Sequence, residues 1–389
     1  MIMAGLIGST PISKFNLVIV LLIPIIIGIC TSSNNDTYLV LKDAFYLSLP
    51  IIFLVLGIFL PTFISLSSFC KIIVLSGTLV SILIIIMTVY RFGLSALINP
   101  FAARYEIGTG GNPLGNPTPI LAIAILLFQK KFGLKLFSNK TIALLVTLNA
   151  IVIYTFASRT YLLFLMIFLF FFIVDSLSVK IAIRFTVVLL AMVLVFALIQ
   201  PGSGSSSSLT EKIVNSSKEV NFSNYGNEED IIYNYRGYES YTALNQFREG
   251  TFSQMVFGKL GKIIDLGIYL NLGGNEMRYV PILHNGYIYA LLKVGVFGML
   301  FYSFFFLLIG LRSWNIYTDA GNPVMYRFLT GLMLATIAGL LITHYVVYSI
   351  FNIEMSILLI FVGYGYALTQ QLPKRSPVSN YELHYATGN

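Results

Sequence analysis

Three histidines occur in the 389-residue chain, and one of them, His284, stands at the start of a long apolar stretch, HNGYIYALLKVGVFG. An imidazole titrates near neutral pH, so it can act as a general base that takes the proton of an attacking hydroxyl group. A histidine at such a boundary can also be an interface residue whose polar tip lies in water. Residue type and position leave both readings open.

Two arginines have the chemistry for a second role, the binding of phosphate. Arg159 is wedged between apolar stretches in YTFASRTYLLFL. A charge at this depth is costly unless it is paired, snorkels to the interface or faces a wet cavity. Because a guanidinium can fork onto phosphate oxygens while it stays charged, Arg159 is placed to hold a lipid-linked phosphate. Arg236 lies among Tyr233, Tyr235 and Tyr238, where cation–π packing and a ligand role are both open.

Further candidates lie close to these residues or on the same predicted side. Arg278 closely precedes His284 and rivals Arg236 as the second phosphate-binding arginine, and Arg104 is a possible pocket residue. Asn285 and Tyr287 are further possible pocket residues, and Asn285 also suits the N-cap of a helix that starts near position 286.

His344, in LITHYVVYSIFN, is expected about two turns inside the outer end of the next span. There it can line the same cavity, or it can hydrogen-bond a neighbouring helix.

The chain shows no spacing of residues that is typical of a metal site. Glu228, Glu229 and Asp230 are adjacent in a polar segment, which indicates solvated charges. Cys30 and Cys70 lie in or at the end of apolar runs and are interpreted as core thiols. GTGGNPLG lacks the Gly-Lys-Ser/Thr ending of a phosphate-binding loop. No metal and no cofactor are therefore expected.

Composition identifies the elements that must position these residues. Hydrophobic residues make up 57% of the chain and charged residues only 10%, whereas a soluble domain has roughly 25% charged residues. Crossing the hydrocarbon core takes roughly 20 helical residues, and several apolar runs approach that length without alternating. The pattern predicts an all-α polytopic membrane protein rather than a β-barrel. The net charge of +8 is typical of basic loops that anchor such a protein, so no nucleic acid is expected as a partner.

Hydropathy predicts about 10 to 12 transmembrane helices. The segments are 15–30, 43–63, 71–90, 118–129, 141–157, 160–174, 181–199, 286–311, 324–350 and 354–372. A break within 43–63 or 118–129 would raise the count above ten. The first segment is read as an uncleaved helix, because its flanking residues do not resemble a signal-peptide cleavage site.

Charge then predicts orientation. The short segment QKKFGLKLFSNK carries four lysines and should lie in the cytoplasm, which also places both chain ends there. The predicted organisation is a first set of spanning helices in 1–199 with a periplasmic loop at 91–117, a large periplasmic loop at 200–285, a second set of helices in 286–372 and a cytoplasmic tail at 373–389. Within the large loop, aromatic and aliphatic residues at three- to four-residue spacing predict a short amphipathic helix that packs on the membrane domain.

Several of these stretches, in the same order, resemble motifs of the O-antigen polymerase (Wzy-type) and O-antigen ligase superfamily of membrane glycosyltransferases. HNGYIYALLKVGVFG resembles the family's His-Asn-x-Tyr element with its following Gly-x-x-Gly, and ASRTYLLFL resembles its Ser-Arg-Thr corner. GTGGNPLGNPTPILAIAILL resembles a Gly/Pro/Asn stretch before an early span. RGYESYTALNQFREGTFSQMVFGKLG resembles the arginine-led part of the periplasmic loop, with Gly258 and Gly261 as its closing turn. The family usually has more spans than the hydropathy of this chain predicts.

The resemblance implies a fold of the GT-C-like type and a reaction at the periplasmic face of the bacterial inner (cytoplasmic) membrane. By position, His284 would deprotonate the acceptor, and Arg159 with Arg236 or Arg278 would bind the pyrophosphate of an undecaprenyl-pyrophosphate-linked oligosaccharide. The implied reaction is a metal-independent, inverting transfer that polymerises repeat units into O-antigen or capsule-type polysaccharide. Membrane lipids are the other partner implied, and the resemblance leaves room for a chain-length regulator (Wzz-type).

Two other functions remain open. An O-antigen ligase would use the same donor and pass the polysaccharide to lipid A–core, so motifs of the donor site do not separate it from a polymerase. A transporter of lipid-linked sugars would place ionisable residues near the middle of the membrane, and the sequence has few charges inside its apolar runs.

Overall fold

Apolar helices dominate the structure, a computed structural model that describes residues 18–32, 35–98, 117–156, 158–174, 231, 234–272 and 275–372. Four helical segments in these ranges are long and apolar enough to cross a membrane. They are α4 (Thr37–Phe59) with its 3-10 extension η1 (Leu60–Thr62), α5 (Leu66–Phe92), α16 (Gly286–Thr318) and α17 (Val324–Thr343). Shorter helices accompany them: α3 (Leu22–Thr31), α6 (Ser95–Ile98), α8 (Thr118–Lys131), α9 (Asn139–Phe156), α10 (Arg159–Val174) and α18 (Ser356–Thr369).

Every predicted span in the described residues corresponds to one of these helices, and the segment 181–199 lies outside them. Within the described residues, three helix ends differ by six or seven residues from the prediction, and one of them is the end of α16, at Thr318 rather than at position 311. Helix α4 starts at Thr37 rather than at position 43, because the Asp36 side chain accepts the N–H of Tyr38 and caps it. The helix predicted at 324–350 ends at Thr343 and is followed by the short 3-10 helices η3 (Ser349–Phe351) and η4 (Ile353–Met355). His344 therefore lies just beyond a helix end and not two turns inside it.

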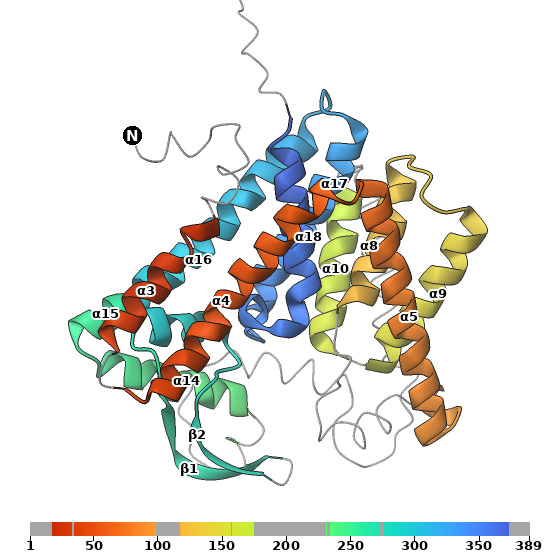
Figure 1. Cartoon of the computed structure of the whole chain (residues 1–389). Helices are drawn as coiled ribbons and strands as arrows, with labels where there is room; N and C mark the ends of the chain where they lie inside the picture. The colour runs from red at the N-terminus through yellow and green to blue at the C-terminus, as the bar shows by residue number, and fades with distance from the viewer. Residues whose placement is uncertain are drawn as a thin grey trace, which may run out of the picture.

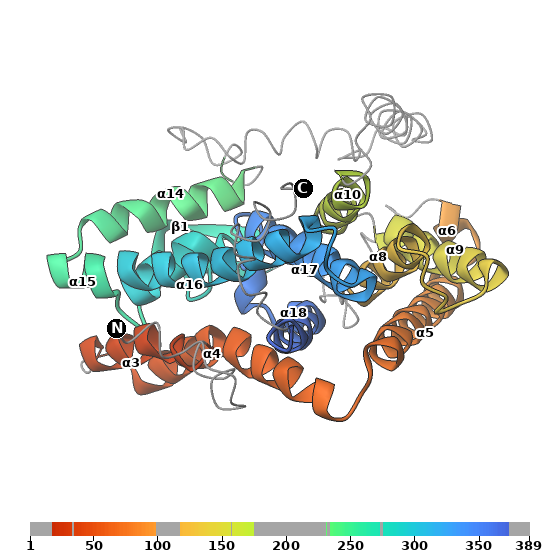
Figure 2. The same ribbon diagram turned by 90° about the horizontal axis from the view of Figure 1, so that it is seen from above.

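The helices form layers around α16 and α17. Seen from above, α14 (Tyr235–Arg248) and α15 (Phe252–Phe257) flank α16 on one side, and α3 and α4 lie on the other (Figure 2). Helix α10 packs against α17 and α8, while α5, α8 and α9 form the far end of the bundle. The close pairing of α4 with α18 depends on Gly57 and Gly363, because a Cβ on either residue would meet the backbone of the other helix.

The bundle has two ends of different character (Figure 1). One end, hereafter the α14 end, carries α14, α15 and a hairpin of two antiparallel strands, β1 (Ile264–Leu272) and β2 (Asn275–Val280). The lysine-rich segment between α8 and α9 lies at the opposite end, where the Lys131 ammonium donates to the Phe172 carbonyl at 2.6 Å and to the Tyr317 hydroxyl at 2.9 Å.

Helix α14 forms where the sequence predicts a short amphipathic helix, but its buried face differs from the prediction. Gly237, Glu239, Ser240 and Ala243 are buried, whereas the apolar residues of the predicted stripe are only half-buried. The hairpin is an addition to the all-α prediction. Its first strand, IDLGIYLNL, alternates apolar and polar residues, and Ile264 and Leu266 are buried while Gly267 and Tyr269 are exposed. This period of two is the sequence signal of a half-buried strand. The prediction missed it because only the short helix within the loop was interpreted, and the period of two in this segment was not used.

Helix α16 is interrupted at Gly295, which has φ 70° and ψ −176° and divides it into residues 286–294 and 296–318. The interruption has a packing cause. The end of α15 crosses at this point, and a Cβ on Gly295 would overlap the Val256 carbonyl. Gly258, with φ 78°, lies equally close to the backbone of Lys293, and the Lys259 N–H donates to the Leu292 carbonyl at 3.0 Å. Only glycine fits the left-handed backbone and the close approach together.

Candidate functional site

The side chain of His284 is held by a carboxylate that lies far away in the sequence. Glu239 Oε2 contacts His284 Nδ1 at 3.1 Å and also accepts the backbone N–H of His284 at 3.0 Å. The Glu239 side chain is fully buried, whereas that of His284 is 41% exposed. Because an ionised carboxylate can only accept, the Nδ1 atom carries the proton, and Nε2 is left as the basic nitrogen of the ring. This is the arrangement in which a carboxylate orients a general base.

Tyr235 completes the surroundings of this pair. Its hydroxyl contacts Glu239 Oε1 at 3.5 Å, and its ring stands edge-on to the His284 imidazole with 5.9 Å between ring centroids. Burial, together with the neighbouring Glu239 carboxylate, raises the pKa of the Tyr235 phenol above its ordinary value. The phenol therefore stays protonated at neutral pH and acts as a donor to Glu239, which offsets part of the cost of burying that carboxylate.

The start of α16 positions His284. Asn285 is the N-cap, as predicted, and its side-chain oxygen accepts the N–H groups of Tyr287 at 3.1 Å and Ile288 at 3.2 Å. The next residue, Gly286, lies directly against the His344 imidazole, so that any Cβ there would overlap the ring. Its N–H also donates to the His344 carbonyl at 2.7 Å. The residues next to the base are thus fixed by capping and by contact with the end of α17.

His344 and Tyr287 act in packing. The His344 side chain is buried, and its Nδ1 accepts the N–H of Ile350 at 3.3 Å. The Tyr287 ring stands edge-on to it at 4.8 Å, and the Tyr287 hydroxyl donates to the Leu341 carbonyl at 2.7 Å. The His344 ring thus hydrogen-bonds the 3-10 helix η3 that follows α17 and packs against Gly286 at the start of α16.

Arg236 lies near the dyad. It is half-buried in the first turn of α14, three residues before Glu239. Residues at that spacing lie on the same side of a helix, so α14 brings the arginine and the carboxylate to one region.

The other predicted arginines differ in how far the structure places them. Arg159 is the first residue of α10, which packs against α17, but its side chain lies outside the described part of the chain. Arg104 and Tyr233 also lie outside the described residues.

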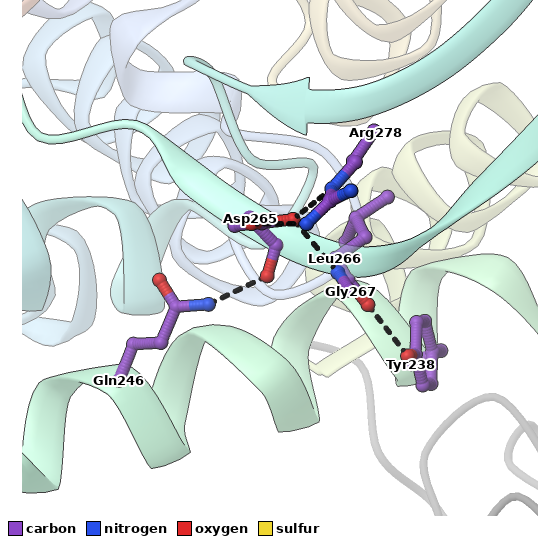
Figure 3. A network of polar contacts seen from close by, with 6 residues as sticks. All are labelled: Tyr238, Gln246, Asp265, Leu266, Gly267 and Arg278. Atoms are coloured by element: carbon purple, nitrogen blue, oxygen red, sulfur yellow. Dashed lines mark hydrogen bonds and ion pairs between the residues drawn. The ribbon is translucent and has the colours of Figure 1, made fainter.

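Arg278 is committed to the hairpin (Figure 3). Its Nε and one terminal nitrogen donate to the two carboxylate oxygens of Asp265 at 2.8 and 2.9 Å, and the rings of Tyr269 and Tyr279 lie 5.4 Å from its guanidinium carbon. Two further bonds fasten this hairpin to α14, from Gln246 and Tyr238 to β1 carbonyls. Arg278 is therefore held by Asp265, which weakens it as a candidate for phosphate binding.

The Asp265–Arg278 pair leads to a prediction on stability and pH. The hydrogen bonds from Arg278 and from the Gly267 N–H hold the pKa of the Asp265 carboxyl below its ordinary value. A lowered folded pKa means that the ion pair stabilises the hairpin at neutral pH, and that this contribution is lost as the pH falls through the lowered value. Asp265→Asn should therefore speed amide exchange in β1 and β2 at pH 7 but leave any turnover unchanged. Exchange rates equal to those of the wild type would contradict the assignment.

Three buried charges escaped the sequence interpretation. Glu239 is one, and the others are Asp43 in α4 and Lys293 in α16, whose carboxylate and ammonium lie 2.6 Å apart. Part of the signal for the latter pair was present, because Lys293 is a lone charge in an apolar run, whereas Asp43 directly follows Lys42. Among the described residues, no three histidine, cysteine or acidic side chains converge as a metal site, and residues 228–230 lie outside them.

Chemically, an imidazole held by a carboxylate is able to take a proton from a hydroxyl group, and the carboxylate would stabilise the imidazolium that forms. Arg236 adds a positive charge on the same helix as Glu239. Comparison of the chain with known protein families, curated proteins and solved structures finds no match.

Proposed function

We propose that the chain is a membrane glycosyltransferase that polymerises undecaprenyl-pyrophosphate-linked repeat units into O-antigen or capsule-type polysaccharide at the periplasmic face of the bacterial inner membrane. The observation that carries the proposal is the Glu239–His284 dyad, which leaves the outer nitrogen of a half-exposed imidazole free for a proton at the N-terminal end of an apolar helix. The α14 end of the bundle is assigned to the periplasm on the charge pattern of the loops.

The proposed reaction is a single displacement. The acceptor hydroxyl gives its proton to His284 Nε2 while its oxygen bonds to the anomeric carbon of the donor. The bond between that carbon and the pyrophosphate oxygen breaks on the opposite face, so the configuration inverts. Arg236 and Arg159 offset the negative charge that develops on the departing pyrophosphate, the role that a divalent ion has in other transferases.

The gene-disruption phenotype tests this proposal against its alternatives. Loss of a polymerase leaves surface glycans that carry single repeat units. Loss of an O-antigen ligase, the main alternative, leaves complete polymer on the carrier lipid because transfer to lipid A–core fails. Loss of a transporter, the second alternative, leaves repeat units trapped on the cytoplasmic side. Polymer left on the carrier or trapped repeat units would each overturn the polymerase assignment.

One structural observation bears on the transporter alternative. Asp43 and Lys293 form a charged pair inside apolar helices, whereas the sequence suggested that such charges are rare. The pair is nevertheless neutral as a whole and closely held by its neighbours, which favours a structural role over a path for a substrate.

The phosphate role of the arginines predicts a strong effect of a conservative substitution. Arg236→Lys and Arg159→Lys should each lower kcat/KM for the lipid-linked donor about 100-fold, because an ammonium cannot reproduce a planar fork of donors. Arg248→Lys is the matched control, since Arg248 is exposed in the last turn of the same helix. Kinetics with purified donor check the result. Unchanged donor affinity and turnover in both variants would rule out a phosphate clamp.

A further inference from the structure

A network of buried polar groups centres on Asp43, in the second turn of α4. Its Oδ2 forms an ion pair with Lys293 at 2.6 Å and accepts the N–H of Gly261 at 2.7 Å, and its Oδ1 accepts the Tyr289 hydroxyl at 3.0 Å. Lys293 also donates to the Lys262 carbonyl at 2.6 Å. Both charged side chains are only 3% exposed. Charges buried to this extent persist only when they are fully partnered, and here each of them is.

The network joins three parts of the chain at one point. Asp43 belongs to α4, Tyr289 and Lys293 belong to α16, and residues 261 and 262 belong to the turn that follows α15. A second contact reinforces it, since the Asn35 side chain, just before α4, donates to the Leu260 carbonyl. The turn is thereby pinned between the start of α4 and the first part of α16.

The part of α16 that is held in this way is the part that carries the candidate base. Gly295 ends the segment 286–294, so this segment can take an orientation of its own relative to 296–318. His284 and Asn285, the N-cap of the helix, lie at one end of the segment, and Lys293 lies at the other end. Tyr289 and Lys293 are four residues apart on the same face, and both contact Asp43.

We infer that Asp43 is a positioning residue for His284, because it fixes the orientation of segment 286–294 through Lys293 and Tyr289. The inference rests on the proposed function. A charged pair suits this task because it is directional and has one satisfied arrangement, whereas apolar contacts allow a helix segment to slide or rotate. Asp43 itself does not touch the reacting groups. It acts through α16 on where the imidazole stands relative to the donor.

The first test is kinetic. Asp43→Asn should lower kcat about 100-fold, the loss that a misplacement of the base by about 1 Å produces. The KM for the donor should stay close to the wild-type value, because the substitution leaves the arginines untouched. Tyr302→Phe is the matched control: the Tyr302 hydroxyl also joins α16 to α4, at 2.9 Å from the Leu47 carbonyl, but beyond Gly295. This control should keep wild-type kcat.

A double variant that removes both charges separates an effect on the position of His284 from an effect on the stability of the fold. Lys293→Met alone should lower the midpoint of thermal unfolding by roughly 5 to 10 °C, because it leaves a buried carboxylate without its cation. The double variant Asp43→Asn/Lys293→Met should regain most of that midpoint but stay impaired in kcat. A double variant with both the stability and the kcat of the wild type would overturn the inference, and so would wild-type kcat in Asp43→Asn.

A distance measurement keeps this test independent of activity. Spin labels are attached to cysteines that replace Tyr38 in α4 and Phe252 in α15, which are 71% and 82% exposed. Cys30 is exposed, so the prediction of a core thiol is wrong for it and it is replaced by serine, whereas Cys70 is buried and is kept. The distribution of distances should be narrow with Asp43 present and broad in Asp43→Asn. An unchanged distance distribution overturns the positioning role of Asp43 even if the chain transfers sugars. Absent turnover in the wild type, combined with a broadened distribution in Asp43→Asn, would reject the proposed function but leave the role of Asp43 in fixing the segment 286–294.

Discussion

Replacing His284 by alanine is expected to lower kcat for glycosyl transfer by about 10³- to 10⁴-fold in reconstituted vesicles. The acceptor hydroxyl would then lose the group that takes its proton, and no other described side chain pairs with Glu239 in the same way. The fold should be retained, because the His284 side chain is 41% exposed and its backbone N–H still donates to Glu239. Binding of the carrier lipid should also persist, since the arginines are unchanged.

The control for this variant is another histidine. His384→Ala removes an imidazole from the segment 373–389, outside the described residues, and should keep wild-type turnover. The thermal unfolding midpoint and carrier-lipid binding are measured alongside turnover, so that a misfolded protein is recognised. Near-wild-type transfer by His284→Ala would remove the base from the mechanism.

Glu239→Gln is expected to lower kcat by about 10³-fold with donor KM retained. The substitution keeps the size of the side chain but removes the negative charge that stabilises the imidazolium. It also allows an amide N–H to face the ring, which would select the tautomer with the proton on Nε2 and block that nitrogen as a base. Because Glu239 is fully buried, the structure offers no solvent to substitute for the lost acceptor.

Tyr235→Phe tests whether the loss in Glu239→Gln comes from the carboxylate charge rather than from the hydrogen bond between Tyr235 and Glu239. The Tyr235 hydroxyl contacts Glu239 at 3.5 Å, and removing it leaves the carboxylate and its bonds to His284 in place. This variant should lose less than about tenfold in kcat, because the contact at 3.5 Å is long for a hydrogen bond. An equal loss in Tyr235→Phe, which keeps the ring and its packing, would contradict the special role given to the Glu239 charge.

The helices could be predicted because their signal is local. An apolar run long enough to cross a membrane is recognised from its hydropathy alone, and each predicted span in the described residues matches a helix. Helix ends were less accurate, since the cap at Asp36 and the end of α17 at Thr343 depend on individual hydrogen bonds. The interruption at Gly295 needed the crossing of α15, a contact between segments that hydropathy does not contain.

The site could be predicted only in part, for the same reason. His284 and Asn285 were found from their place at a helix start, and Asn285 has the expected capping role. Glu239 was missed because its partner lies 45 residues away, and only tertiary packing turns that carboxylate toward the imidazole. Arg278 could not be separated from Arg236 until β1 was seen to supply Asp265 as its partner.

The chain's ability to make polymer is measured most directly by incubating the purified protein in vesicles with one undecaprenyl-pyrophosphate-linked repeat unit and separating the products by size. We expect a ladder of lipid-linked products that differ by one repeat unit, formed equally in the presence of a chelator and absent with His284→Ala. Repeat units that remain single with the wild-type protein, with the donor intact and the protein folded, would contradict the account.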